Sequence, residues 1–369
     1  MSAIDSGVVS GEYTYLPIER VYFGSGSISK LASELDRIGS KRPFLVTGQS
    51  IAQKTDLIAR LEHAAGTKLA GIFSEIKQHA PISGIMRAAT AVREAKADSL
   101  ISLGGGSPID STKIIVKELS EGFQGPAIPH IAVPTTLSAA EFSHIAGMTD
   151  EKLNRKTGFR DLRMVPQLIF LDPELTIPTP GWLWASSGIR SLDHAVEALY
   201  SPNHQPYVDI LALEAIHLLF QNLKVSTENP ANLKFRLNCQ LAAWMSFAGV
   251  VSVGTGLSHS IGRVIGATWN IPHGITSCLT LSEVMRKEAK RNPERLALIA
   301  RAEGKTTEGV PVEKVALEAA DGVADIVRVL GLSKRLRDYG IRKDDLPKIA
   351  RDVGDHQSAD ALQVLERIW

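Results

Sequence analysis

A change in the secondary-structure pattern near residue 178 constrains the fold of this chain more than any other feature. Before it, short runs of β-branched and aliphatic residues alternate with stretches of helical periodicity, which is typical of a doubly wound parallel sheet. After it, amphipathic segments follow one another almost to Trp369, with no strand-like run between them. The sequence therefore predicts an α/β domain over residues 1–178 and an all-helical domain over residues 179–369.

Five runs are expected to form the strands of the sheet, and two prolines mark its end. The runs are RPFLVTG, KLAGIFSEI, SLISLGGG, HIAVPTT and QLIFLD, with a clear helix over ISGIMRAATAVREAKA between the second and the third. The later stretch IPTP can continue neither a helix nor a strand, because two of its four residues are prolines. It is the expected boundary between the domains.

Charge and composition exclude several classes of partner. The chain has 41 basic and 40 acidic side chains, a net charge of +1, so no chain-wide field attracts nucleic acid or an anionic membrane. No apolar run reaches the roughly 18 residues of a spanning helix, and MSAIDSGVVSGEY does not resemble a signal peptide. Cys239 and Cys278 lack the spacing of a disulfide framework or a thiolate zinc site, which fits a reducing compartment. We expect a cytoplasmic protein whose partner is a small molecule.

A glycine-rich turn after the third strand is the first chemical signal. The strand runs into Gly104, Gly105 and Gly106, with Ser107 expected as N-cap and Pro108 as the first helical residue. Three glycines let the backbone approach a ligand, and free amides at a helix start favour an anion such as pyrophosphate. We interpret the turn as a phosphate cradle. A glycine-rich turn without a ligand remains the alternative, since GGGS is not the GxGxxG fingerprint.

Two threonines end the next strand. Thr135 and Thr136 reach the carboxyl edge of the same sheet, where open α/β sheets bind their ligands. Their hydroxyl groups suit contacts with phosphate, ribose or an amide, but β-branched residues are also common at strand ends because of their propensity. The pair supports a ligand site only together with the glycine turn.

Three histidines lie next to small or apolar residues in the helical half. His194 follows SGIRSLD, and His259 and His273 stand 14 residues apart in GLSHSIGRVIGATWNIPHG. Such histidines are either satisfied core side chains or inward-facing ligands and catalytic acids. Their occurrence together favours a site.

These motifs follow the order and spacing of the iron-containing alcohol dehydrogenase family, which the chain resembles. The matching stretches are RVYFGSGSISKL, GGGSPIDSTK, PTT, LDPELT, DHAVEALYS and the segment of His259 and His273, and they cover residues 20 to about 285. The chain looks most similar to the maleylacetate reductase branch. The segment from PTT to Glu141 is one residue shorter than in ordinary alcohol dehydrogenases, and KTG at 156–158 resembles that branch.

The resemblance implies a nicotinamide cofactor, NADPH or NADH, in the cleft between a nucleotide domain and a helical domain, and a homodimer. By position, Gly104 to Ser107 would hold pyrophosphate, Asp110 and Lys156 would line the cleft, and Thr135, Thr136 and Leu137 would contact the nucleotide. Gly48, Gln49 and Ser50 follow the first strand, where NAD-selective relatives often have an acidic residue. NADPH is therefore predicted to bind at least comparably to NADH.

Two arginines depart from the family pattern. His194, His259 and His273 match three of the four metal ligands of metal-dependent members, but Arg190 holds the place of the fourth, an aspartate one turn before His194. A guanidinium cannot coordinate a divalent cation and repels one at close range. Arg263, one turn beyond His259, replaces a further family histidine. We therefore expect no metal.

Asp193 is expected not to take over as a ligand, because it lies on a different helix face from its neighbour His194. A guanidinium can instead polarise a carbonyl oxygen, and its fork matches a carboxylate. The sequence thus predicts a metal-independent NAD(P)H-dependent reductase of an oxo-acid such as a maleylacetate-like compound. Arg190 or Arg263 would stabilise the oxyanion, and one of the three histidines would donate the proton. The alternatives are a non-redox lyase or cyclase that uses the same cleft, a catalytically silent binding protein, and arginines that only pair with carboxylates such as Glu197 or Glu141.

Overall fold

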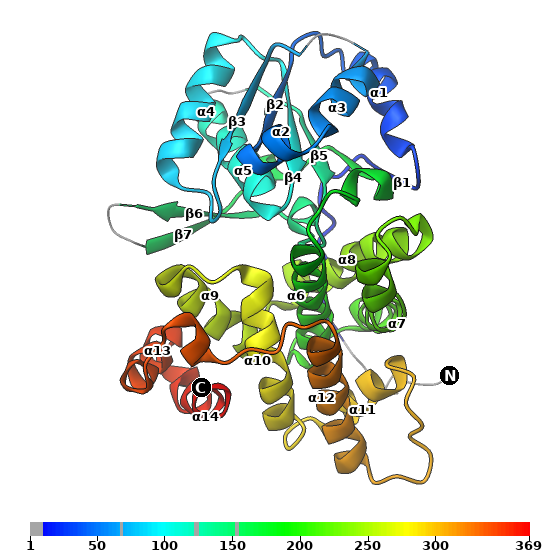
Figure 1. Ribbon diagram of the computed structural model, residues 1–369, viewed down its shortest axis with the longest axis vertical. Helices are drawn as coiled ribbons and strands as arrows, with labels where there is room; N and C mark the ends of the chain where they lie inside the picture. The colour runs from blue at the N-terminus through cyan, green and yellow to red at the C-terminus, as the bar shows by residue number, and fades with distance from the viewer. Residues whose placement is uncertain (1–9, 67–68, 122–124, 152–154) are drawn as a thin grey trace. The chain divides into compact units, whose positions relative to one another are not determined.

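The computed structural model describes residues 10–66, 69–121, 125–151 and 155–369, with the backbone alone for residues 155 and 156. They divide into two compact units, Tyr15–Thr179 and Pro180–Trp369, and the described residues before Tyr15 group with the second. The predicted fold class is confirmed, because the first unit is a parallel α/β structure and the second is helical (Figure 1). The division falls one residue after the predicted boundary, and residues 10–14 group with the helical unit.

A six-stranded parallel sheet with the strand order β1-β8-β5-β4-β2-β3 forms the centre of the first unit. Its strands are β1 (Arg20–Phe23), β2 (Pro43–Gly48), β3 (Gly71–Ile76), β4 (Ser99–Gly104), β5 (His130–Pro134) and β8 (Leu168–Leu171). The five expected strands are all present. Two further elements were not expected from the sequence: β1, a four-residue strand at the sheet edge, and the antiparallel hairpin of β6 (Ile145–Asp150) and β7 (Arg155–Arg160).

Helices cover both faces of this sheet (Figure 1). Because neighbouring strand residues point to opposite faces, Leu45 of β2 packs with α1 and α3, whereas Phe44 and Val46 pack with α4 and α5. Burial on both sides explains why the strands are recognisable as continuous apolar runs. The helices of this unit are α1 (Leu31–Arg37), α2 (Gln49–Lys54), α3 (Leu57–Ala65), α4 (Ile82–Glu94) and α5 (Gly106–Ser120).

The strand order reverses at β2, and this reversal positions the predicted ligand loops. From β2 the chain passes to β3 on one side, and then crosses back to β4 on the other side of β2. Open α/β sheets bind ligands at the carboxyl ends of the strands at such a switch point. Thr47 is in register with Leu103, and Gly104 with Pro134, so the loops after β2, β4 and β5 start side by side.

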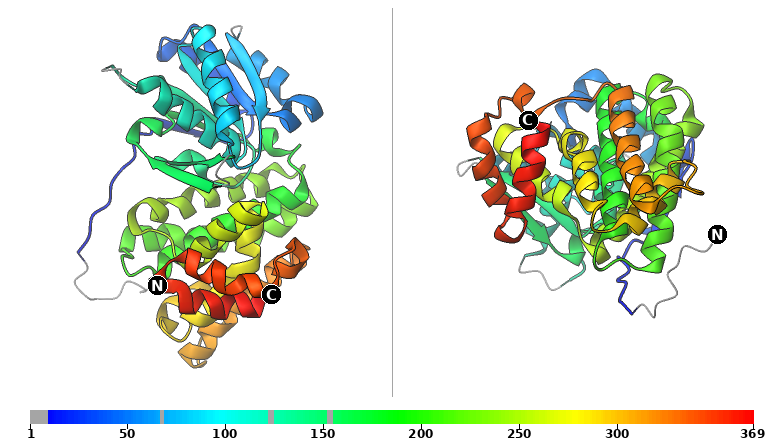
Figure 2. Two further views of the ribbon diagram at one scale, coloured as in Figure 1. Left: turned by 90° about the vertical axis from the view of Figure 1, so that its left-hand side faces the viewer. Right: turned by 90° about the horizontal axis from the view of Figure 1, so that it is seen from below.

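The second unit is built around α6, which contacts α7, α8 and α10 (Figure 2). Every residue from Trp184 to Leu199 except Arg190 is buried, so this helix is enclosed on nearly all sides. No single helix of the described part is long and apolar enough to cross a membrane. Helices α8 and α9 reach that length and apolar composition only together, as a pair bent by 99°. The helices are α6 (Gly181–Tyr200), α7 (Pro206–Glu228), α8 (Leu233–Val253), α9 (Leu257–Trp269), α10 (His273–Glu288), α11 (Pro293–Ala302), α12 (Val312–Val329), α13 (Leu346–Val353) and α14 (Ser358–Ile368).

Candidate active site

The predicted cofactor residues of the α/β unit lie mainly on three neighbouring loops of the sheet edge. Gly48 ends β2 and is the N-cap of α2, Gly104 ends β4, and Thr135 directly follows β5. The backbone N–H of Thr135 donates to the carbonyl oxygen of Gly104 over 2.9 Å, which joins two of these loops. Gln49 and Ser50 are exposed at the same edge.

The glycine turn brings its backbone close to the second loop. Gly104 has a φ of 142°, which other residues rarely adopt, and a Cβ on Gly105 would lie 3.1 Å from Cγ2 of Thr136. Helix α5 begins at Gly106 with Gly105 as its N-cap. The prediction that Ser107 caps this helix is therefore wrong. The glycines adopt the turn and let the helix start two residues earlier than a side-chain cap at Ser107 would allow.

Lys113 on α5 is a residue of this region that the sequence analysis missed. It is fully buried, and its ammonium donates to the carbonyl oxygen of Ala140, to Oγ of Ser143 over 2.9 Å and to the carbonyl oxygen of Ile145 over 3.0 Å. Burial lowers its pKa to about 8. Burial also raises the pKa of Glu141, in the same segment, to about 7. The lysine ties the segment after β5 to α5, and its signal in the sequence is a lone cation in the apolar run TKIIV.

The remaining predicted cofactor residues have different surroundings. Asp110 is half-buried, with Oδ1 at 3.9 Å from Nζ of Lys113. Leu137 is completely buried. Lys156 belongs to β7, but its side chain lies outside the described part of the chain.

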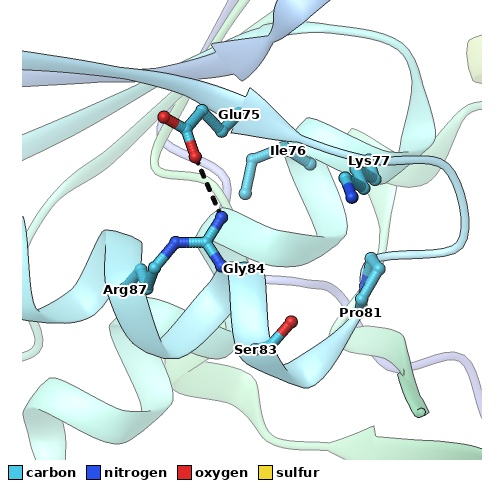
Figure 3. A pocket seen from close by; sticks show the side chains of 7 residues that line it. All are labelled: Glu75, Ile76, Lys77, Pro81, Ser83, Gly84 and Arg87. Carbon is cyan, nitrogen blue, oxygen red and sulfur yellow. Dashed lines mark hydrogen bonds and ion pairs between the residues drawn. The ribbon is translucent and has the colours of Figure 1, made fainter.

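A pocket lies where β3 ends and α4 begins (Figure 3). Gly48 pairs with Ile76 in the sheet, which places the pocket next to the predicted nucleotide loop. Arg87 donates to Glu75 over 3.0 Å, and Lys77 is exposed. The lining residues are Glu75, Ile76, Lys77, Pro81, Ser83, Gly84 and Arg87.

Two of the three predicted histidines come together in the helical unit. His194 of α6 and His259 of α9 are buried, and their ring centroids are 4.9 Å apart. Phe247 of α8 packs edge-on against His194. Nδ1 of His194 and Nε2 of His259 are buried without a hydrogen-bond partner in the described part of the molecule, so both can bind another group. His273 is the first residue of α10 and is half-buried.

Arg190 lies one turn before His194 and is already engaged. Its Nη1 donates to Oγ of Ser277 over 3.1 Å and is 3.7 Å from Oδ2 of Asp193. The same Asp193 oxygen accepts the hydroxyl groups of Ser258 and Ser277 over 2.8 and 2.6 Å. Arg190 and Asp193 therefore form an internal ion pair that links α6 to α9 and α10.

The premise that its helix face excludes Asp193 as a ligand beside the histidines is wrong. Its Oδ2 lies 3.5 Å from Nδ1 of His259. The reason is that α6 is buried on nearly all sides. Neighbouring residues on different faces of this helix can therefore contact the same core residues. Asp193 and His194 both reach His259 in this way.

Glu197 is the carboxylate closest to His259. It is 1% exposed, and its Oε2 lies 2.7 Å from Nδ1 of His259. From the sequence, Glu197 was expected only as a possible partner for the arginines. It follows His194 by three residues, nearly one helical turn, and this spacing is the signal that could have found it.

The charges around the two histidines drive their pKa values in opposite directions. Burial and Arg190 oppose protonation of His259, but the carboxylates of Asp193 and Glu197 outweigh them and raise the pKa of the imidazole. Burial, with the charges of His259 and Arg190, lowers the pKa of His194 well below its usual value. His259 thus favours the protonated form and His194 the neutral form.

Three side chains of this cluster have a spacing compatible with a metal ion. Asp193, Glu197 and His259 each offer one atom, and these atoms lie within 4.8 Å of one another. This group includes neither His194 nor His273. The two Glu197 oxygens and Oδ2 of Asp193 already accept hydrogen bonds, which leaves Oδ1 of Asp193 and Nε2 of His259 without partners in the described part.

Arg263 differs from Arg190 in its surroundings. It lies one turn beyond His259 on α9 and is exposed. Among the described residues, no hydrogen bond or ion pair engages its guanidinium. Arg263 is therefore accessible to an anionic ligand.

Comparison with known proteins identifies the family. Residues 18–173 match the model of "Iron-containing alcohol dehydrogenase", and residues 184–363 match "Fe-containing alcohol dehydrogenase family, C-terminal". The chain is 30% identical over 340 residues to a maleylacetate reductase of Sphingobium indicum, with 92% of this chain and 90% of that protein covered. It is 31% identical over 357 residues to the lactaldehyde reductase of Escherichia coli K12, with 91% and 92% covered.

A solved structure supports the same relationship. The maleylacetate reductase of Agrobacterium tumefaciens superimposes with a TM-score of 0.85 at 26% identity, covering 98% of this chain and 99% of that one. Family models match both units, and the two reductases extend over nine-tenths of the chain. These similarities support a nicotinamide cofactor. The chain belongs to the iron-containing alcohol dehydrogenase family and is an oxidoreductase.

Proposed function

We propose that the protein is a metal-independent, NAD(P)H-dependent reductase of an oxo-acid. The observation that carries this proposal is the internal ion pair of Arg190 and Asp193 beside the two buried histidines. Arg190 stands where the family resemblance implies an aspartate ligand, and a guanidinium has no lone pair to offer a metal ion.

The charges of the cluster also favour a site without a metal. With His259 protonated, Arg190 and His259 balance Asp193 and Glu197, so the buried group is neutral. A divalent ion about 4 Å from the guanidinium would be repelled by about 8 kcal/mol at an effective dielectric constant of about 20. The carboxylate oxygens that such an ion would need are largely occupied by hydrogen bonds. We conclude that these residues do not fit a resident metal.

The side chains of the cluster supply the remaining parts of a carbonyl reduction. The nicotinamide would supply a hydride to the carbonyl carbon. We assign proton donation to His259, because its Nε2 has no hydrogen-bond partner in the described part and two carboxylates favour its charged form. The printed contacts of Arg190 use its Nη1, so its other N–H groups would stabilise negative charge on the carbonyl oxygen. The exposed Arg263 would bind a substrate carboxylate.

Two observations support an oxo-acid as the substrate. Arg263 is a permanent cation without a described partner, and a guanidinium fork matches a carboxylate group. Several relatives of this chain are maleylacetate reductases. A maleylacetate-like compound is therefore the first substrate to test.

The test combines metal analysis with activity. Protein prepared without added metal is expected to contain far less than one iron or zinc ion per chain, and to reduce maleylacetate with NADH or NADPH in a strong chelator. Arg263→Ala is expected to raise KM by about 10- to 100-fold, since a charged hydrogen bond contributes about 1.5–3 kcal/mol. Arg328→Ala, at an exposed ion pair on α12, is the control. One tightly held divalent ion per chain, or loss of activity in the chelator, contradicts metal independence.

A further inference from the structure

Glu197 makes two kinds of contact at the start of α9. Its Oε2 accepts from the backbone N–H of Gly256 over 2.5 Å, and its Oε1 accepts from that of Ser258 over 2.7 Å. These groups belong to the first turn of α9, whose own N-cap, Gly256, has no side chain to satisfy them. Its Oε2 also lies 2.7 Å from Nδ1 of His259. One carboxylate from α6 thus caps α9 and holds the imidazole in its first turn.

The loop before α9 is shaped to receive this carboxylate. A Cβ on Gly256 would lie 2.9 Å from Oε1 and 3.3 Å from Oε2 of Glu197, so the carboxylate would have to shift to admit a side chain there. A glycine at this position leaves room for both backbone bonds and the imidazole contact. Asp193, the other nearby carboxylate, is 3.5 Å from Nδ1 of His259 and directs its Oδ2 to two hydroxyl groups.

The imidazole contact determines which nitrogen of His259 can react. An ionised carboxylate only accepts hydrogen bonds, so Nδ1 must carry a proton to donate to Glu197. Nε2, the other nitrogen, is buried and has no hydrogen-bond partner in the described part of the chain. The second nitrogen is therefore the one available to a bound molecule.

We infer that Glu197 is a positioning residue for His259. Its carboxylate fixes the proton on Nδ1 and the orientation of the ring, so that Nε2 gives its proton to the substrate. This inference rests on the proposed carbonyl reduction. Nε2 would give its proton to the carbonyl oxygen while the carbonyl carbon gains the hydride that a bound dihydronicotinamide would supply, and the π electrons of the carbonyl would move to its oxygen. The products would be the hydroxy-acid, the oxidised cofactor and a neutral His259 that keeps its Nδ1 proton and regains the other from water.

The experiment observes His259 directly and then measures turnover. In protein labelled with ¹⁵N-histidine and free of substrate, NMR is expected to show a protonated Nδ1 for His259, assigned by its loss in His259→Asn. Glu197→Gln is expected to abolish the preference of the His259 proton for Nδ1. It is also expected to lower kcat by about 10- to 100-fold, the usual effect of removing a group that orients a functional histidine. The KM for the oxo-acid should change little.

Two further variants separate positioning from simple stability. Gly256→Ala keeps every charge but displaces the Glu197 carboxylate, and it is expected to change the His259 signal and kcat in the same direction. Asp172→Asn is the matched control, because Asp172 is also buried and accepts the backbone N–H groups of Ile28 and Glu174 far along the chain from His259. It should lower stability and leave the His259 signal unchanged.

The outcomes distinguish this inference from the proposed function. A wild-type His259 that is protonated at Nε2 alone overturns the inference, as does a folded Glu197→Gln variant with unchanged signal and kcat. If Glu197→Gln does not fold, an unchanged signal in folded Gly256→Ala overturns it equally. If the Nδ1 proton depends on Glu197 but no oxo-acid is reduced, the positioning of His259 stands and the proposed substrate class fails.

Discussion

Removal of Arg190 should expose how strongly this chain depends on its internal ion pair. In Arg190→Met, the buried carboxylate of Asp193 loses its cation at 3.7 Å. In Asp193→Asn, the guanidinium, whose side chain is 16% exposed, loses its anion. The double variant removes both charges and leaves a neutral pair. The three proteins and the wild type form a double-mutant cycle.

The structure sets the expected magnitudes. At 3.7 Å the direct attraction is about 4 kcal/mol at an effective dielectric constant of about 20. Breaking a buried pair by removing one partner costs about 3–5 kcal/mol. Arg190→Met should lie near 3 kcal/mol, at the lower end, because Asp193 keeps the hydroxyl groups of Ser258 and Ser277. The double variant should cost less than the sum of the single ones, with a coupling of about 2 kcal/mol.

The tryptophans allow this cycle to be measured on the helical unit alone. All five, from Trp182 to Trp369, lie in that unit, so urea unfolding followed by their fluorescence reports its stability. The coupling is the difference between the double variant and the sum of the single variants. Single-variant effects that add within about 0.5 kcal/mol would refute the reasoning, because they would show that the two charges do not stabilise each other.

Two further predictions concern the cofactor and the pH dependence of stability. Lys77→Glu reverses a charge beside the Gly48 loop. In titrations of cofactor affinity, this variant is expected to weaken NADPH binding about tenfold more than NADH binding, a difference of about 1.4 kcal/mol. Equal weakening of both cofactors contradicts this prediction. Burial outweighs the ion pair with Lys305 and raises the pKa of Glu303 to about 8. Between about pH 4.5 and 8, the Glu303 carboxyl group is therefore protonated in the folded chain but ionised in the unfolded chain. Stability should therefore fall as the pH rises from about 4.5 to 8, and Glu303→Gln should flatten this slope in urea unfolding curves; an unchanged slope contradicts the reasoning.

Much of the fold could be predicted because its signals are local. The strands β2, β4, β5 and β8 are buried runs that periodicity reveals, and the position of ligand loops at the carboxyl edge follows from parallel topology. Strand β1 was missed because it has only four residues at an edge, where burial does not select a continuous apolar run. The N-cap of α5 was predicted at the wrong residue because serine is a preferred N-cap, which favoured Ser107. In the structure the glycine backbone approaches Thr136 closely, and the helix begins at Gly106 with Gly105 as its N-cap.

The candidate site was less predictable because its contacts join distant parts of the chain. Glu197 and Gly256 are 59 residues apart, and Lys113 and Ala140 are 27 apart, so no spacing rule reveals either contact. Asp193 reaches His259 despite its helix face, because α6 is buried on nearly all sides and not on one face alone. The homodimer, the cytoplasmic location, the restriction to a small-molecule partner, metal independence and the binding and catalytic roles of the candidate residues stay predictions.

The pattern of pairing explains how a histidine site could persist in a family named for its metal. Each of the two carboxylates beside the histidines has a principal cation: Glu197 contacts His259, and Asp193 contacts Arg190. A metal ion in such a site would both neutralise the carboxylates and hold the histidines in place. Here the guanidinium can take the first role and the carboxylate of Glu197 the second. Because Arg190 neutralises a carboxylate and Glu197 orients a histidine, a substitution of one residue can change charge balance without changing histidine orientation. A single metal ion that performed both roles would not allow this.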